Sequence, residues 1–365
     1  MTPSETAVAR IIVDKIGSST GPCRLSHEVE LSSYIVAEEG YCIAVRALDE
    51  KEVYNQIETT DGVFETIHAG DVLIGALGER QALKGYSGRI PRRIQTGDIL
   101  NVLNMGGIIG QCTSDHPDLG PALRVEVLGA VLVERHGQKL HARLADHALE
   151  PVYTLDYSAP LVMVSGTSMN TGKTYACGQI VKGLTAHGLR VAAAKLTGAS
   201  LMRDARVMRE NGAIACATFT DAGVVCSTSK NMAPVAKTLI RHLNQFEPDV
   251  LVLELGDGFI GYYGVDDLLM DKELQRFTRA HVVAATDLAG AWAADNLFRS
   301  RYRAEIAAFT GPVTDNNVGK QYIRNAFGTE ALNAMQDADA LSLLVAQRVA
   351  IPSGGDGFLR LSAAG

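Results

Sequence analysis

The segment from Gly166 to Thr174 carries the clearest chemistry in this sequence. It reads Gly-Thr-Ser-Met-Asn-Thr-Gly-Lys-Thr, and it lies between an apolar run at 161–164 and a helical pattern that begins near Tyr175. A strand, a glycine-containing turn and a helix N-terminus in this order direct several backbone N–H groups at one anion. The sequence therefore predicts a phosphate-binding loop.

Two side chains at the end of the loop are expected to bind the phosphates and a metal ion. Lys173 is expected to reach the β- and γ-phosphates of a bound nucleoside triphosphate, and the Thr174 hydroxyl to bind Mg²⁺. Five residues separate Gly166 from Gly172, one more than in the usual pattern, so the loop is a deviant form. The predicted cofactor-binding residues of the loop are Gly166, Thr167, Ser168, Asn170, Thr171, Gly172, Lys173 and Thr174.

Composition limits the classes of protein to consider. The chain has 365 residues, 47% of them hydrophobic, and a net charge of −7, which is typical of a soluble protein with two domains. It has no basic run or basic aromatic stripe, so no nucleic-acid partner is expected. The apolar stretches are too short to span a membrane, and the N-terminus does not resemble a secretion signal. We therefore expect a cytoplasmic location and no membrane contact.

The pattern of apolar and turn-forming residues changes near residue 155, which divides the chain into two parts. Residues 1–155 show short apolar runs between Gly, Asp, Ser and Pro, which predicts a β-rich, barrel-like domain that binds substrate or a partner. Gly70-Asp71-Val72-Leu73 recurs as Gly97-Asp98-Ile99-Leu100, and both related hairpins and coincidence explain this repeat. Residues 156–365 alternate strand and helix patterns, which predicts an α/β domain with a parallel sheet covered by helices on both faces.

The expected elements of the second domain can be given by residue range. Strands are predicted at 161–165, 189–195, 249–254, 280–286 and 304–310. Helices are predicted at 173–187, 199–211, 230–246, 265–278, 288–300, 317–327 and 329–348. Because ligands of such sheets bind at the carboxyl ends of the strands, the residues just past each strand are the candidates for a site.

Charged residues end two of these strands. Lys195 closes the second strand and is expected to contact phosphate or a substrate carboxylate, or else to be a solvated lysine. Glu254 closes the third strand after an apolar run, where a buried carboxylate needs a cation. We therefore predict that Glu254 binds Mg²⁺ together with Thr174, and that Lys173, Lys195 and Glu254 are the catalytic residues. Asp257 is a second candidate carboxylate.

Three later turns carry polar side chains. Ser227 to Ser229 precede a helix and either contact the γ-phosphate or substrate or act as a plain helix cap. Thr286-Asp287 follows the fourth strand. Thr314, Asp315 and Asn316 follow the fifth strand, where a nucleotide base usually lies, and they are predicted to recognise the base, with a turn and cap as the alternative.

The first domain offers two further candidates. Glycines surround the cations Arg89, Arg92 and Arg93, which suits an anionic small-molecule substrate, although a solvated hairpin loop explains the pattern too. Six scattered cysteines without a Cys-x-x-Cys pair predict reduced thiols. Cys112 and His116 lie close in sequence, but a polar loop after a strand explains them better than a metal or nucleophile site.

Three motifs together resemble one branch of the deviant phosphate-loop NTPases. The loop at 166–174, Lys195 with a nearby glycine, and Glu254-x-Gly256-x-Gly258 are similar to dethiobiotin synthetases, over roughly residues 160–320. The segment also resembles the phosphate-loop half of the DUF1611 family, which includes N-acyltransferases. The resemblance implies that Lys173, Thr174 and Glu254 handle MgATP, and that the chain forms a homodimer. Ser168 departs from the aspartate of the dethiobiotin synthetase motif, and residues 1–155 have no counterpart there.

Three functions remain open at this stage. The first is a MgATP-dependent ligase or phosphoryl transferase that activates a small carboxylate, carbamate or amine. The second is a nucleotide-dependent regulatory or binding module, whose turnover would respond to a protein and not to a small molecule. The third follows the DUF1611 resemblance and is an N-acyltransferase whose phosphate loop holds the diphosphate of coenzyme A.

Overall fold

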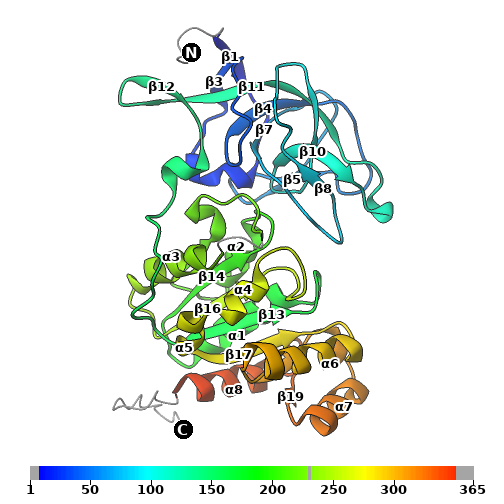
Figure 1. Ribbon diagram of the computed structural model, residues 1–365, viewed down its shortest axis with the longest axis vertical. Helices are drawn as coiled ribbons and strands as arrows, with labels where there is room; N and C mark the ends of the chain where they lie inside the picture. The colour runs from blue at the N-terminus through cyan, green and yellow to red at the C-terminus, as the bar shows by residue number, and fades with distance from the viewer. Residues whose placement is uncertain (1–7, 229–231, 351–365) are drawn as a thin grey trace. The chain divides into compact units, whose positions relative to one another are not determined.

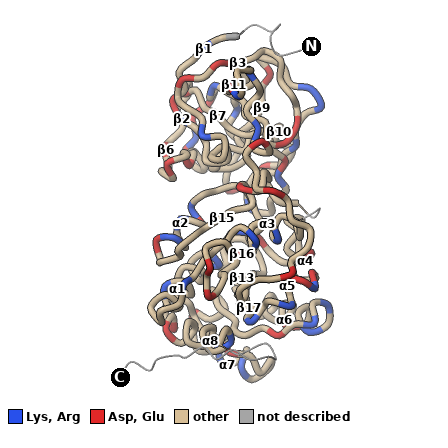
Figure 2. Tube along the Cα trace, turned by 90° about the vertical axis from the view of Figure 1, so that its left-hand side faces the viewer, with Lys and Arg blue, Asp and Glu red and all other residues tan. Residues whose placement is uncertain are grey.

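The computed structural model describes residues 8–228 and 232–350. Contacts between Cα atoms divide the chain into two compact units. The β-rich unit comprises 1–151 together with the later segments 198–204 and 218–228, and the α/β unit comprises 152–197, 205–217 and 229–365. Figure 2 shows positive and negative residues interspersed along the trace of each unit.

The α/β unit is built on a seven-stranded sheet with the order β15-β14-β16-β13-β17-β18-β19. Figure 1 labels β14, β16, β13, β17 and β19 of this sheet. Its central strand, β13 (Leu161–Gly166), pairs in parallel with β16 (Val250–Leu255) on one side and with β17 (Thr278–Ala284) on the other. Every residue of β13, of β16 and of β14 (Val191–Thr197) is buried. Continuous apolar runs of this kind belong to a parallel sheet that is covered on both faces. The predicted parallel sheet is confirmed.

Helices connect and cover these strands. Two of them, α1 (Lys173–Ala186) and α8 (Ala338–Ala350), share one hydrophobic core in which Ile180 and Val345 are fully buried. A Cβ atom on Gly183 would lie 2.1 Å from Oγ of Ser342, so glycine at 183 lets α1 and α8 approach closely. The other α-helices are α2 (Arg203–Glu210), α3 (Met232–Asn244), α4 (Val265–Met270), α5 (Lys272–Phe277), α6 (Leu288–Leu297) and α7 (Asn317–Phe327).

The largest differences between the predicted and the observed elements of this unit are five. The strands β15 (Ala215–Thr218) and β19 (Glu330–Ala331) were not predicted. The predicted helix at 199–211 begins only at Arg203. The helix at 265–278 is interrupted, because the Asp271 side chain accepts hydrogen bonds from Glu273 N and Leu274 N and caps a new helix. The helix at 329–348 begins at Ala338, after β19 and a polar turn.

The β-rich unit contains a closed ring of strands. Each strand of the ring pairs with the next in the order β4 (Cys42–Ala47), β7 (Val72–Leu77), β10 (Ile108–Ser114), β9 (Ile99–Val102) and β11 (Arg124–Arg135). The last strand, β11, pairs with β4 and closes the ring. The ring surrounds a core that includes Val45, Leu73 and Val125. The barrel-like expectation agrees with this pairing. Further strands extend the ring: β1 (Val8–Ile12), β2 (Lys15–Ile16), β3 (Glu28–Ser32), β8 (Ser87–Arg89) and β12 (Gln138–His141), while β5 (Gln56–Glu58) and β6 (Phe64–Thr66) form a separate pair.

The two Gly-Asp copies of the sequence repeat form the same turn. Gly70 and Gly97 have φ of +94° and +90°, and each glycine precedes a strand of the ring. Oδ2 of Asp71 accepts a hydrogen bond from His68 N at 2.7 Å, and Oδ2 of Asp98 accepts one from Gln95 N at 2.8 Å. The repeat therefore reflects two copies of one strand-entry turn, in which glycine adopts the left-handed backbone and aspartate closes the loop.

Candidate functional site

The predicted phosphate loop leads from β13 into α1. Lys173 is the first residue of α1, and Gly172 caps the helix with a φ of +87°, a left-handed conformation that favours glycine. Asn170 also has a positive φ, of +59°. The loop thus turns sharply immediately before the helix N-terminus, where backbone N–H groups and the helix dipole favour an anion.

Close backbone contacts at two glycines fix the conformation of the phosphate loop. A Cβ atom on Gly166 would lie 2.6 Å from Oγ1 of Thr171, and one on Gly258 would lie 2.6 Å from the carbonyl oxygen of Thr167. Thr167 N donates to the carbonyl of Ala284 at 2.9 Å. These positions leave no room for a larger side chain, so the glycines at 166 and 258 are required for the observed loop conformation.

Lys173 lies over the loop that precedes it. Its Nζ donates to the carbonyl of Ser168 at 2.7 Å and contacts Oγ1 of Thr171 at 3.4 Å. The lysine is only 6% exposed. A phosphate that enters the loop meets this ammonium group among backbone dipoles, which is the arrangement that phosphate loops use.

Thr174 and Glu254 meet at the carboxyl end of the sheet. The Thr174 hydroxyl donates a 2.9 Å hydrogen bond to Oε1 of Glu254, which is 2% exposed. A hydroxyl group that donates its O–H to a carboxylate can also act, through its oxygen, as a ligand of a cation. A hydroxyl and a carboxylate are hard oxygen ligands of the kind that Mg²⁺ prefers. The pair fits the metal that the sequence predicts.

Lys195 lies beside this pair in the sheet. The parallel ladder of β14 and β16 sets Lys195 directly against Glu254, and that of β13 and β16 sets Val164 against Glu254. Neighbours in register project their side chains to the same face of a sheet. Lys195 is 6% exposed. The structure therefore brings Lys195, Glu254 and Thr174 together, although they come from three separate elements.

The glycine-rich segment after β16 also borders the loop. Phe259 N donates to the carbonyl of Gly166 at 3.1 Å, and Gly258 N donates to Oδ1 of Asp257 at 2.9 Å. Asp257 has a φ of +69°, which is strained for a residue other than glycine. Asp257, the second candidate carboxylate, thus lies in the segment that packs against the phosphate loop.

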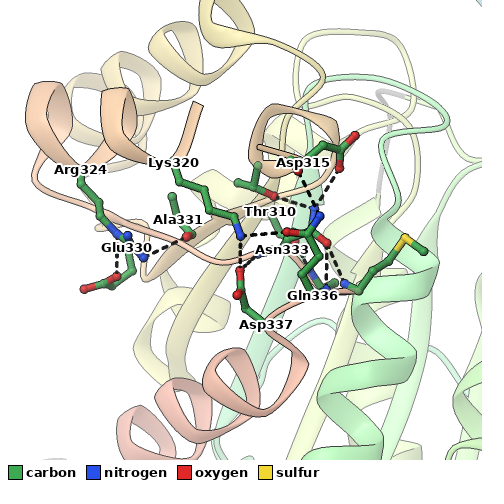
Figure 3. Close-up of polar contacts among 12 residues, drawn as sticks. Thr310, Asp315, Lys320, Arg324, Glu330, Ala331, Asn333, Gln336 and Asp337 are labelled. Atoms are coloured by element: carbon green, nitrogen blue, oxygen red, sulfur yellow. Dashed lines mark hydrogen bonds and ion pairs between the residues drawn. The ribbon is translucent and has the colours of Figure 1, made fainter. Parts of the chain in front are cut away.

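The three predicted base-recognition residues lie in a polar turn before α7. The Thr314 hydroxyl donates to the carbonyl of Gly311 at 2.7 Å. Oδ1 of Asp315 accepts a 2.9 Å hydrogen bond from Nδ2 of Asn333, which Figure 3 shows. Oδ1 of Asn316 accepts a 2.9 Å hydrogen bond from Val318 N and caps α7. Each side chain has a structural task here, and their contact with a base stays a prediction.

Asn333 organises this turn, and sequence reasoning missed it. It is 3% exposed, and its Oδ1 accepts from Met335 N at 2.9 Å while its backbone N–H donates to Oδ2 of Asp337 at 2.9 Å. Lys320 donates to the same carboxylate of Asp337 at 2.6 Å (Figure 3). Residues 329–348 were predicted as one helix, and that pattern gave no signal for a turn at 333.

Two other predicted turns have distinct surroundings. Thr286 N donates to Oγ1 of Thr167 at 3.3 Å, which places it next to the phosphate loop, and Asp287 caps α6 through Gly290 N at 2.8 Å. Oγ of Ser227 accepts a 2.7 Å hydrogen bond from Gly198 N within the β-rich unit. The last residue of this predicted turn, Ser229, lies outside the described residues.

The candidate residues of the β-rich unit are a cysteine, Cys112, and the three arginines at 89, 92 and 93. Burial and a hydrogen bond to Asp115 raise the pKa of the Cys112 thiol to about 11, so it is a poor nucleophile at neutral pH. No cluster of three or more His, Cys, Asp or Glu residues suited to a metal occurs in 8–228 and 232–350. Arg89 lies in β8 and contacts Gln111, while Arg92 and Arg93 are exposed.

Comparisons with known proteins give only distant likenesses. No protein-family profile and no curated protein sequence matches the chain. Its structure is similar to the signal recognition particle receptor FtsY from Elizabethkingia anophelis, with 13% identity, coverage of 54% of this chain and 67% of that chain, and a TM-score of 0.37. It is also similar to the hydrogenase maturation factor HypB from Archaeoglobus fulgidus, with 18% identity, coverage of 52% and 78%, and a TM-score of 0.29. Likenesses of this size assign no activity, so the site is interpreted from its own geometry.

No helix in 8–228 and 232–350 combines the length and the apolar character that a membrane crossing needs.

Proposed function

We propose that this chain is a MgATP-dependent enzyme that activates a small carboxylate, carbamate or amine substrate, as a ligase or phosphoryl transferase. The observation that carries the proposal is the 2.9 Å hydrogen bond between Thr174 and Glu254 at the end of a phosphate loop. It joins a hydroxyl and a carboxylate from two elements at the position where phosphoryl-transfer sites hold Mg²⁺. The motif resemblance to dethiobiotin synthetases supports the same chemistry.

Each residue has a task in this proposal. The N-terminus of α1 and the loop amides bind the phosphates, and Lys173 neutralises charge on the β- and γ-phosphates. Thr174 and Glu254 hold the Mg²⁺ ion, which when bound withdraws charge from the transferring phosphoryl group. Lys195, in register with Glu254, supplies a second cation for a phosphate or for the substrate carboxylate. Phosphoryl transfer depends mainly on such positioning and charge neutralisation.

The test is a binding panel with ATP, GTP and coenzyme A, each with and without Mg²⁺, measured as a shift of the thermal unfolding midpoint. We expect ATP with Mg²⁺ to stabilise the protein by about 2.7 kcal/mol at one hundred times its dissociation constant. Lys173→Ala should abolish that shift and leave the unliganded midpoint unchanged. Lys182→Ala, which removes an exposed lysine of the same helix, is the matched control.

Two other results would contradict the proposal, one from this panel and one from an assay of ATP turnover. Stabilisation by coenzyme A without any response to ATP and Mg²⁺ would favour the N-acyltransferase alternative. ATP turnover that increases only with a protein partner, and not with any small carboxylate or amine, would favour the regulatory module.

A further inference from the structure

A pair of buried thiols lies in the β-rich unit, which contains none of the residues proposed for catalysis. The Sγ atoms of Cys23 and Cys42 are 3.7 Å apart. Cys23 ends the short helix η2 (Ser18–Cys23), and Cys42 begins β4. Cys42 is fully buried, and Cys23 is 6% exposed. Two thiols at this separation are close enough to react with each other after small side-chain rotations, because a disulfide needs about 2.0 Å between sulfur atoms.

The two thiols differ in acidity. The Cys42 S–H donates to Sγ of Cys23, and this hydrogen bond lowers the pKa of Cys23 and raises that of Cys42. The guanidinium group of Arg135 further lowers the pKa of Cys23, whereas burial and the carboxylate of Asp146 act in the opposite direction. Cys23 therefore forms a thiolate more readily than its neighbour, and it is also the thiol nearer to solvent.

The backbone around the pair indicates which side can move. β4 is held on both sides, since Cys42 pairs with Ala76 of β7 and its N–H donates to the carbonyl of Ala142 at 2.9 Å. η2 is a short 3-10 helix that ends at Cys23, and Arg24 follows it with a φ of +49°. The sulfur atoms can thus approach by about 1.7 Å through movement at the end of η2 while β4 stays in place.

We propose that Cys23 and Cys42 form a reversible disulfide when the protein meets a hydroperoxide. The Cys23 thiolate attacks the terminal oxygen of the hydroperoxide; an S–O bond forms, the O–O bond breaks, and the alkoxide leaves as the alcohol after it takes a proton. Cys23 is then a sulfenic acid. Cys42 attacks its sulfur, the S–S bond forms, and the hydroxyl group leaves as water with the Cys42 proton. Two thiols are oxidised and one hydroperoxide is reduced.

Two other cysteines, Cys112 and Cys216, combine greater exposure with a raised thiol pKa. Burial raises the pKa of Cys216, and burial with Asp115 raises that of Cys112 to about 11, so both stay protonated at neutral pH. Both are nevertheless more exposed than Cys23. If exposure alone decided reactivity, a peroxide would oxidise them first, and this difference makes them internal controls.

The experiment treats the full-length protein with hydrogen peroxide at neutral pH and maps its cysteines by mass spectrometry. Trypsin releases Cys23 in the peptide 16–24 and Cys42 in the peptide 25–46, each with a single cysteine. We expect the two peptides to appear joined, lighter by two hydrogen atoms than their sum, and to separate after treatment with dithiothreitol. Free thiols counted after denaturation should fall from six to four.

Substitutions separate the two steps. Cys42→Ser should stop at the sulfenic acid of Cys23, which dimedone captures, because a serine hydroxyl can still donate to Sγ of Cys23. Cys42→Ala also removes the second thiol, but it removes the hydrogen bond that lowers the pKa of Cys23, so the sulfenic acid should form more slowly. Cys23→Ser should keep its remaining thiols, and Cys216→Ser should behave like the unmodified protein. Oxidation of Cys112 or Cys216 while peptides 16–24 and 25–46 stay reduced would overturn the proposal, as would irreversible sulfinic acid at Cys23 in place of the crosslink.

Discussion

The Thr174 hydroxyl, in the first turn of α1, donates to Oε1 of Glu254, the fifth residue of β16, across 2.9 Å. Eighty residues separate the two in sequence. β13 and β16 are adjacent and parallel, so their carboxyl ends meet at one edge of the sheet. The helix that follows β13 thus begins next to the carboxylate near the end of β16, and this adjacency assembles the proposed metal site.

Replacement of Glu254 by Gln should reduce turnover far more than nucleotide affinity. The substitution keeps the size of the side chain and removes the charge that faces Thr174 and the proposed Mg²⁺ ion. We expect the turnover number to fall about 100-fold while the dissociation constant for ATP changes only a few-fold. Steady-state kinetics and direct titration measure the two quantities, with the exposed Glu210→Gln as control. Equal losses in both, or no loss in either, would show that Glu254 is only structural.

A single methyl group at residue 258 should damage the phosphate loop. A Cβ atom there would lie 2.6 Å from the carbonyl oxygen of Thr167, so Gly258→Ala must displace the loop backbone. We expect at least roughly a tenfold loss of ATP affinity, since phosphate binding depends on loop amides held in place. Gly261→Ala is a matched control, because its Cβ would come no closer than 3.8 Å to Gly258. If both variants bind ATP normally, the segment after β16 does not support the loop.

The loop and the ends of the strands could be predicted because local sequence determines them. A buried strand, a glycine turn and a lysine at a helix start form one continuous segment, and Glu254 ends an apolar run. The sequence predicted these residues one by one, whereas their contact depends on the strand order β14-β16-β13, which no local pattern contains.

The missed elements depend on contacts distant in sequence. β19 is two residues long and exists because Glu330 and Ala331 pair with β18 (Ala308–Thr310). The turn after it is held by Lys320, which reaches Asp337 from α7. A helix-like composition at 329–348 could not reveal either contact, because tertiary pairing overrides local propensity in short segments.

Stability should fall on mild acidification because of one buried histidine. Burial lowers the pKa of His281 from 6.5 to about 4, and its Nε2 lies 2.8 Å from Oε1 of Gln275. The unfolded chain therefore binds a proton between these pH values that the folded chain does not bind, so the free energy of unfolding decreases as the pH falls from 6.5 to about 4. The loss is on the order of 3 kcal/mol, at about 1.4 kcal/mol for each pH unit.

Chemical denaturation at several pH values measures this dependence. His281→Gln should reduce the loss between pH 6.5 and about 4 by an amount on the order of 3 kcal/mol, whereas substitution of the exposed His187 by Gln should leave it unchanged. An identical pH profile for His281→Gln and the unmodified protein would assign the acid sensitivity to other groups.

The cations of the β-rich unit should serve substrate binding and not nucleotide binding. Arg92 and Arg93 are exposed and form no ion pair with any residue in 8–228 and 232–350. Unpaired guanidinium groups are suited to a carboxylate or phosphate on a second ligand, since they bind such groups in a bidentate manner. In the proposed site, the phosphate loop and its Mg²⁺ ion already neutralise the charge of ATP. The two arginines are therefore available for the anionic substrate.

The double substitution Arg92→Ala and Arg93→Ala should accordingly raise the Michaelis constant for the substrate by about tenfold, or roughly 1.4 kcal/mol, and leave the ATP dissociation constant unchanged. The double substitution Arg10→Ala and Arg46→Ala, which removes two exposed cations of β1 and β4, is the control for the change in net charge. A weaker ATP affinity with an unaltered Michaelis constant for the substrate would instead assign these arginines to the nucleotide. If neither the Michaelis constant nor the ATP dissociation constant changes, Arg92 and Arg93 belong to a solvated hairpin loop, which is the alternative that the sequence also allows. Exposed cations without a ligand contribute little to binding or stability.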